Sequence, residues 1–111
     1  MSITIILYYL YIGGINMKIL KGNNRFFIGE SEENDVARIT FYYKEENVIV
    51  IDHTFVSPEL RGQSVAGKLL SEVVNFAKEN NLLIIPVCSY AVKVMSRPGY
   101  EDILYKDSTI R

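Results

Sequence analysis

Cysteine and histidine are almost absent from this chain of 111 residues, which contains one of each, Cys88 and His53. A single cysteine cannot form an intramolecular disulfide, and it excludes a metal site built from several cysteines. One histidine argues in the same way against an ordinary zinc site. We therefore expect no bound metal, and the free thiol favours a reducing compartment.

Neither sign of charge is in excess, because 12 lysines and arginines stand against 13 aspartates and glutamates, for a formal net charge of −1. A dedicated nucleic-acid-binding protein normally carries a basic stripe, so we expect no nucleic-acid partner. The isoelectric point near 5.8 and the apolar fraction of 49% are typical of a folded, soluble protein, which we expect in the cytoplasm.

Long apolar runs are also missing. The longest, residues 5–12, is far too short to span a bilayer, so we expect no membrane segment. It lies in an apolar, uncharged stretch over residues 1–16, in which the Gly13-Gly14 codons can spell a bacterial ribosome-binding site shortly before the Met17 codon. We expect residues 1–16 to be an apolar leader that is not natively translated. The alternative is an extra β-strand, which the alternating apolar residues allow.

The apolar residues that are present suffice for one modest core, and we expect residues 17–111 to form a single domain. Apolar side chains recur at three- and four-residue spacing over residues 65–80, which predicts one long amphipathic helix. Strands are expected before it at residues 18–20, 25–28, 36–43 and 48–56. A strand at 82–87, a short helix at 89–95 and a last strand or tail at 100–106 are expected after it. This order predicts an α+β domain, with antiparallel strands followed by a parallel β–α–β unit.

The most informative segment covers residues 48–66. A β-branched strand ends in a Ser-Pro turn, and a second turn that contains Gly62 then opens the long helix. Backbone N–H groups at such a turn and the positive end of the helix dipole converge on one point, and pyrophosphate groups bind there. Gly62 lets the backbone approach a ligand closely, and Arg61 adds a positive charge. The segment therefore predicts a phosphate-bearing ligand and an enzyme.

Several blocks of the sequence, taken in order, resemble the GNAT superfamily of acetyl-CoA-dependent N-acetyltransferases. The blocks are FFIGE at 26–30, ARITFYY at 37–43, IDHTFVSPELRGQSVAGKLL at 51–70 and IPVCSYAVKVMSRPGY at 85–100. They are most similar to its YjdJ-type branch of small acetyltransferase-like domains, and the resemblance covers residues 17–106. It implies a trimmed acyl-CoA N-acyltransferase fold without the usual N-terminal helices, where many relatives build an acceptor pocket.

The resemblance also implies where acetyl-CoA would bind. Its pantetheine arm would lie between two splayed parallel strands and bond backbone groups of Phe55 and Val56. The superfamily holds the pyrophosphate at a Q/R-x-x-G-x-G/A turn, and the matching residues here are Arg61, Gly62, Gln63, Ser64, Val65 and Ala66. Ser64 departs from the pattern, which has glycine there, and its Cβ would crowd the turn and weaken binding.

Acetyl transfer to an amine needs a base, donors for the oxyanion, and an acid for the departing thiolate. Many members of the superfamily end the second parallel strand with N-x-x-A-x-x-x-Y, in which the tyrosine is the acid. Here Cys88 replaces the asparagine and Met95 replaces the tyrosine. The Cys88 thiol would then act as an acid, or as a nucleophile that forms an acetyl-cysteine, and the helix from Ser89 would favour its thiolate. A small buried hydrophobe is the alternative.

His53 is the candidate general base, because an imidazole titrates near neutrality. Strand alternation predicts its side chain on the same face as Ile51 and Phe55, opposite Asp52 and Thr54. The alternative is a core histidine that is satisfied by its neighbours.

Tyr90 offers another proton donor, and Ser89 would donate to the thioester carbonyl or cap the short helix. We predict an acetyl-CoA-dependent N-acetyltransferase that acts on a small-molecule or protein amine, as a monomer or weak homodimer. The alternative is a CoA-binding regulatory or interaction module without turnover, which Met95, Ser64 and the missing helices favour. A third possibility is a structural domain that binds nothing, and calorimetry with acetyl-CoA separates it from the other two.

Overall fold

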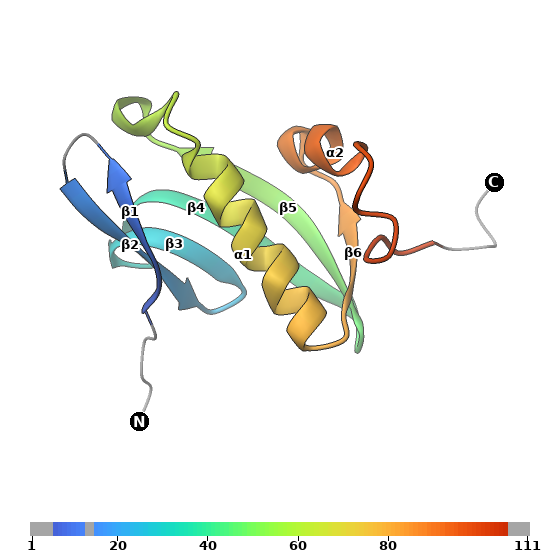
Figure 1. Cartoon of the computed structure of the whole chain (residues 1–111). Helices are drawn as coiled ribbons and strands as arrows, with labels where there is room; N and C mark the ends of the chain where they lie inside the picture. The colour runs from blue at the N-terminus through green and yellow to red at the C-terminus, as the bar shows by residue number, and fades with distance from the viewer. Residues whose placement is uncertain (1–5, 13–14, 107–111) are drawn as a thin grey trace.

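The computed structural model describes residues 6–12 and 15–106, and one twisted sheet with a long helix across it dominates the fold (Figure 1). The described sheet has six strands in the order β1-β2-β3-β4-β5-β6. Their bounds are β1 Ile6–Ile12, β2 Ile15–Gly22, β3 Arg25–Ser31, β4 Asn34–Glu45, β5 Val48–Val56 and β6 Leu83–Pro86. The helices are α1 Val65–Glu79 and α2 Ser89–Met95, and a 3-10 turn, Pro58–Leu60, precedes α1.

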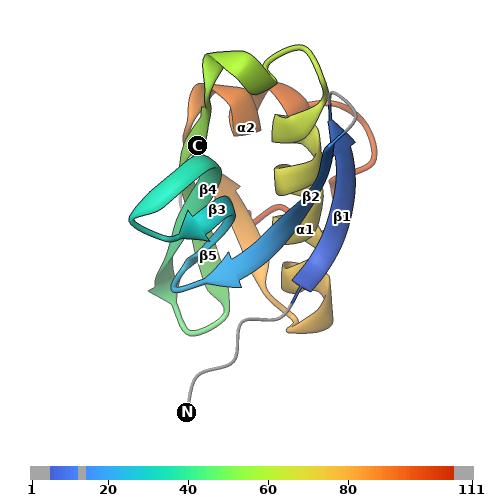
Figure 2. The same ribbon diagram turned by 90° about the vertical axis from the view of Figure 1, so that its left-hand side faces the viewer.

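The strand directions follow from the connections. Each neighbouring pair from β1 to β5 is antiparallel, and short turns join the strands from β2 to β5. β5 and β6 are parallel, with α1 as the crossover between them. Figure 2 shows the twist that carries the sheet from β5 round to β1. The predicted α+β order, with a β–α–β unit after antiparallel strands, is confirmed.

The core lies between α1 and one face of the sheet. The apolar face of α1 buries Val65, Leu69, Leu70, Val73, Val74 and Ala77, which recur at the helical period. The facing side of β4 buries every second residue, Ala37, Ile39 and Phe41. At one end, the Phe76 ring of α1 packs against those of Phe26 and Phe41, with centroids 6.0 and 5.6 Å away. This packing fixes α1 across β3, β4 and β5.

The predicted element bounds agree best in the β–α–β part of the chain. β5 and α2 have the predicted limits, and α1 ends one residue earlier than predicted. The β3–β4 hairpin is tighter than expected, because β3 continues to Ser31 and β4 begins at Asn34. The predicted last strand is reduced to a single bridge between Leu104 and Ile84.

The stretch before Met17 includes strand β1, which is antiparallel to β2 and places Leu10 opposite Met17. Residues 6–12 therefore form an extra β-strand, which was the alternative interpretation of residues 1–16. The translation start at Met17 stays a prediction. Within the described residues, no helix is both long enough and apolar enough to cross a membrane.

Candidate functional site

β5 and β6 diverge halfway along β5. Ile51 is the last residue of β5 that pairs with β6, at Pro86. The Ile51 carbonyl accepts hydrogen bonds from the backbone amides of Val87, at 2.9 Å, and Cys88, at 3.1 Å. Beyond Ile51, β5 continues to Val56 beside β4, while the chain after β6 turns into α2. We call the resulting opening the β5–β6 gap, and it confirms the predicted splay of the parallel strands.

The backbone of the last part of β5 offers hydrogen-bonding groups to this gap. The Ser57 amide donates to the Val36 carbonyl on the β4 side at 2.8 Å. Successive residues of an antiparallel strand direct their N–H and C=O groups to alternate sides. Val56 and Thr54 therefore direct theirs toward the gap, whereas Phe55 directs its own toward β4. The backbone groups of Val56 and Thr54 thus face the gap and those of Phe55 do not, while the predicted bonds of Phe55 and Val56 to pantetheine stay a prediction.

A β-bulge interrupts β5 just where the two strands diverge. Phe41 lies opposite Ile51, and the preceding residue of β4, Thr40, lies opposite His53. Asp52 is therefore an extra residue without a cross-strand partner, and such a residue shifts the side-chain alternation by one position.

The bulge overturns the predicted arrangement of side chains on β5. Thr54 lies opposite the fully buried Ile39, and cross-strand partners share a face, so Thr54 faces α1 as Ile51 does. His53 is exposed on the other face, where Asp52 accepts a hydrogen bond of 2.6 Å from the Thr40 hydroxyl. The predicted faces were wrong because strict alternation holds only in an unbroken strand. His53 is therefore no core histidine.

Thr54 and Cys88 meet across the β5–β6 gap. The Thr54 hydroxyl oxygen and the Cys88 sulfur are 3.3 Å apart, and either group can be the donor. Cys88 is half-buried and forms the N-cap of α2 without a side-chain capping bond. Ser89 is the first helical residue and is exposed, so the predicted capping role does not fall on Ser89.

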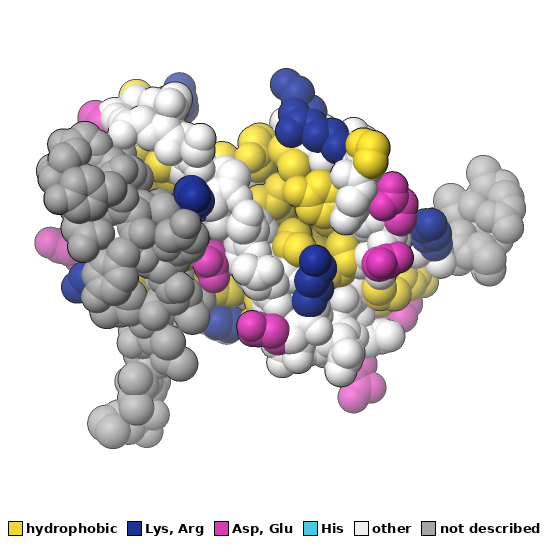
Figure 3. Space-filling model, in the orientation of Figure 1, with side chains coloured by type: hydrophobic (Ala, Val, Ile, Leu, Met, Phe, Trp, Pro, Cys, Tyr) yellow, Lys and Arg dark blue, Asp and Glu magenta, His cyan; other side chains and the backbone are white. Residues whose placement is uncertain are grey.

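A pocket of about 230 Å³ lies beside the gap and includes most of the predicted phosphate-binding turn. It is lined by Val56, Leu60, Arg61, Gly62, Ser64, Val65, Ala66, Gly67 and Tyr90. Gln63 does not line it, and its amide donates instead to the Glu59 carbonyl at 3.4 Å. Hydrophobic side chains gather on the surface between α1 and α2, with basic side chains at the border (Figure 3).

The turn before α1 depends on two residues with positive φ. Gly62 has φ +78°, and a Cβ there would meet nothing within 4 Å, so glycine is needed for its backbone angle. Ser64, the N-cap of α1, has φ 64° and ψ 23°, in the left-handed region, and makes no side-chain capping bond. For an L-residue this backbone conformation costs about 1–2 kcal/mol, which explains why the superfamily pattern has glycine at the position of Ser64. Arg61 Nε donates to the Val56 carbonyl at 3.1 Å and ties the turn to β5.

Tyr90 enters the pocket from α2. Its hydroxyl lies 3.5 Å from the point where a Cβ on Gly67 would be. Burial is the main cause that raises the pKa of Tyr90, and Tyr100 adds to it while Arg97 opposes it. The phenol is therefore protonated at neutral pH and able to donate. Met95, at the position of the superfamily's tyrosine, is 1% exposed within the core.

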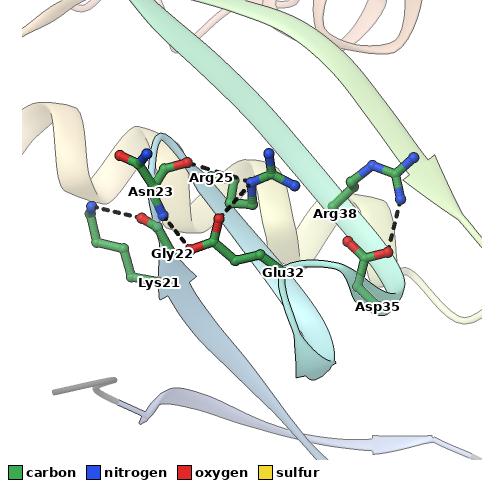
Figure 4. Close-up of polar contacts among 7 residues, drawn as sticks. All are labelled: Lys21, Gly22, Asn23, Arg25, Glu32, Asp35 and Arg38. Carbon is green, nitrogen blue, oxygen red and sulfur yellow. Dashed lines mark hydrogen bonds and ion pairs between the residues drawn. The ribbon is translucent and has the colours of Figure 1, made fainter. Parts of the chain in front are cut away.

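A separate polar cluster connects the β2–β3 and β3–β4 hairpins (Figure 4). Glu32 accepts a hydrogen bond of 2.8 Å from the backbone N–H of Asn23 and pairs with Arg25 at 3.4 Å. Asp35 pairs with Arg38 at 2.8 Å on β4. These acidic side chains thus stabilise the hairpins. In the described ranges 6–12 and 15–106, no group of three metal-ligating side chains is placed to hold an ion.

A mixed sheet with two splayed parallel strands, beside a left-handed turn that opens a helix, defines the acyl-CoA N-acyltransferase class of fold. Residues 25–103 match the sequence model of the family described as GCN5-related N-acetyl-transferase, and the chain belongs to that family. The predicted superfamily and enzyme class are thereby confirmed, and membership of the YjdJ-type branch stays a prediction.

Solved structures agree with this assignment. The NMR solution structure of a GCN5-like protein from Staphylococcus aureus is 44% identical, with a TM-score of 0.66 over 84% of this chain and 92% of that chain. An acetyltransferase of the GNAT family from Staphylococcus aureus Mu50 is 22% identical, with a TM-score of 0.51 over 65% of this chain and 49% of that chain. The N-acetylglutamate synthase of Neisseria gonorrhoeae, complexed with coenzyme A and N-acetyl-glutamate, is 13% identical, with a TM-score of 0.52 over 68% and 18%. The last two share the fold alone. No curated protein sequence matches the chain.

Proposed function

We propose that this N-acetyltransferase binds acetyl-CoA in the β5–β6 gap and transfers the acetyl group to a small-molecule or protein amine. The observation that carries the proposal is the end of β5–β6 pairing at Ile51, next to the pocket formed by the turn before α1. The complex of the Neisseria gonorrhoeae synthase with coenzyme A supports this ligand for the shared fold.

The turn before α1 would hold the pyrophosphate. Backbone amides from Gly62 to Ala66 lie at the N-terminal end of α1, where the helix dipole favours negative charge. Arg61 lines the same pocket and adds a full positive charge. The pantetheine arm would then run along Val56 and Thr54 into the gap, beside the apolar surface between α1 and α2 (Figure 3).

Cys88, Tyr90 and His53 would carry out the transfer. The Cys88 thiolate attacks the thioester carbonyl carbon, a new carbon–sulfur bond forms to Cys88, and the bond to the CoA sulfur breaks. Tyr90 donates its proton to the departing CoA thiolate. The amine then attacks the acetyl-cysteine and restores Cys88. His53 is exposed on the sheet face away from α1, so it would accept the amine proton through an intervening water.

Isothermal calorimetry with acetyl-CoA tests the binding site. We expect binding by the wild type and weaker binding by Arg61→Ala, with less dependence on salt because one charge is lost. Arg25→Ala is the matched control, since it removes the same charge from the β2–β3 hairpin. The absence of both heat and a thermal shift with the wild type would overturn the proposal.

Two experiments test the chemistry. A screen of polyamines, amino acids and peptide N-termini, read out by CoA release and by product mass, identifies the acceptor. Intact-mass measurement after incubation with acetyl-CoA, without acceptor, tests whether one acetyl group is added to Cys88. Full turnover by Cys88→Ala on a proven acceptor would exclude the cysteine step and leave direct transfer to the amine.

A CoA-binding module without turnover is the second candidate. The burial of Met95 favours it, because the acid of many relatives is missing from this position. It predicts acetyl-CoA binding without CoA release in the acceptor screen. We further propose that the protein is bacterial and cytoplasmic, which the similar protein from Staphylococcus aureus supports. We also propose that it is a monomer or weak homodimer, which light scattering across a concentration series tests.

A further inference from the structure

The contact between Thr54 and Cys88 joins the two elements that otherwise separate at the β5–β6 gap. Thr54 belongs to the part of β5 beyond Ile51, and Cys88 follows the end of β6. Both side chains are half-buried, and their polar atoms are 3.3 Å apart. Thr54 also directs its backbone groups into the gap, so the residue lies where the thioester would be.

The bulge at Asp52 is what brings the Thr54 hydroxyl to this place. In an unbroken strand Thr54 would share a face with Asp52 and point away from Ile51. The extra residue reverses this, and Thr54 comes to lie opposite Ile39 on the α1 side. Bulges next to active sites commonly redirect a side chain in this way.

We propose that Thr54 is a positioning residue for Cys88, an inference that rests on the proposed role of the cysteine as nucleophile. The hydroxyl accepts a hydrogen bond from the thiol and donates one to the thiolate, because it has both a proton and lone pairs. Donation to the charged form stabilises the thiolate that attacks the thioester carbonyl carbon. The same bond holds the Cys88 sulfur toward the gap and fixes its side-chain rotamer.

The single cysteine makes this proposal directly measurable. Because Cys88 is the one thiol in the chain, alkylation by iodoacetamide reports on its sulfur alone. The rate is measured as a function of pH for the wild type and for Thr54→Val, which keeps the β-branched shape but lacks the hydroxyl. Thr54→Ser keeps the hydroxyl. Thr40→Val is the control, since its hydroxyl bonds Asp52 on the other face of the sheet.

We expect Thr54→Val to move the midpoint of the alkylation profile up by about one pH unit, the size of a hydrogen bond to a charged group. Acetylation of Cys88 should slow by about tenfold at saturating acetyl-CoA, where a change in the Kd for acetyl-CoA does not contribute. Thr54→Ser and Thr40→Val should both retain the wild-type profile. Circular dichroism confirms that each variant is folded, and Thr54→Ala replaces Thr54→Val if that variant is not.

The outcomes separate this proposal from the proposed function. An alkylation profile unchanged in Thr54→Val overturns the positioning role, even if Cys88 is acetylated. A Thr54→Ser variant that behaves as Thr54→Val does also overturns it, because the hydroxyl is then irrelevant. If wild-type Cys88 is never acetylated, the nucleophile step fails, while a shifted profile still supports the coupling of Thr54 to the sulfur.

Discussion

Ser64 holds a backbone conformation that favours glycine, and it gains nothing from its hydroxyl as a helix cap. Replacement by glycine removes a left-handed penalty of about 1–2 kcal/mol and costs about 0.5–1 kcal/mol in backbone entropy. We expect Ser64→Gly to raise the free energy of unfolding by up to about 1 kcal/mol, measured by urea denaturation. Acetyl-CoA should bind more tightly, because the turn then fits the superfamily pattern.

Ser71 provides the matched control for this substitution. It is exposed within α1, where Ser71→Gly should lower the free energy of unfolding by roughly 0.5 kcal/mol through loss of helix propensity. Equal destabilisation by Ser64→Gly and Ser71→Gly would contradict this prediction. Relief of the left-handed strain at Ser64 would then be smaller than the extra backbone entropy that glycine loses on folding.

The raised pKa of Tyr90 makes stability depend on pH in the alkaline range. In the unfolded chain a tyrosine ionises near pH 10, whereas burial keeps the proton on Tyr90 in the folded chain. The contribution is therefore complete below about pH 10 and is lost as pH rises further, since the unfolded state releases its proton first. We expect Tyr90→Phe to reduce this decline, measured by denaturation on both sides of pH 10.

The same variant tests Tyr90 as the proton donor. Loss of a general acid lowers kcat by about 10² or more, with a smaller effect on the Kd for acetyl-CoA. Tyr43→Phe is the control, because Tyr43 is exposed on β4 and does not line the pocket. Equal kcat values for the two variants would remove Tyr90 from the chemistry.

At the scale of elements, α1 both stabilises the core and borders the pocket. Gly67 lies inside α1, where alanine is favoured by about 1 kcal/mol, and its Cβ would contact the Tyr90 hydroxyl at an ordinary 3.5 Å. We expect Gly67→Ala to raise the free energy of unfolding by about that amount. Its methyl group also narrows the pocket, so calorimetry should give weaker acetyl-CoA binding.

Ser71→Ala separates the two effects of the Gly67 substitution. It improves helix propensity at an exposed position of α1 that does not line the pocket. It should raise stability by a smaller amount, about 0.5 kcal/mol, and leave acetyl-CoA affinity unchanged. Tight binding by Gly67→Ala would mean that the ligand does not approach this turn of the helix.

Elements were predictable from the sequence wherever local periodicity decides them. The apolar run of β5 and the three- and four-residue spacing in α1 gave nearly the observed limits. The bulge at Asp52 has no such signal, because it is set by the register between β4 and β5. The faces of His53 and Thr54 therefore came out wrong, and the Thr54 contact with Cys88 was missed. Gly62 and the glycine that the superfamily pattern has at Ser64 were the hints of left-handed positions in the turn before α1.

For the whole molecule, the order of blocks in the sequence was enough to give the fold, since a β–α–β unit allows essentially one handedness. The acceptor side was not predictable in the same way. With His53 as the proposed base, this side lies on the sheet face away from α1, where His53 and Asp52 are exposed. Contacts between distant parts of the chain decide this face, and no local pattern encodes them.

At the scale of the whole molecule, the contribution of residues 1–16 to folding and binding can be predicted. A chain that begins at Met17 lacks β1 but keeps the buried Ile19 and the pairing of β2 with β3. β1 pairs with β2 at the sheet edge opposite β6, far along the strand order from the β5–β6 gap. We therefore expect residues 17–111 to unfold cooperatively and to bind acetyl-CoA as the full chain does.

Expression of both chains, followed by thermal denaturation and calorimetry, makes this comparison, and N-terminal sequencing of protein from the native locus identifies the start. A shortened chain that fails to fold would mean that β1 covers part of the core through β2, and that residues 1–16 belong to the domain. Equal affinity in both chains would show that the CoA site does not need β1, which also lies outside residues 25–103, the part of the chain that matches the family.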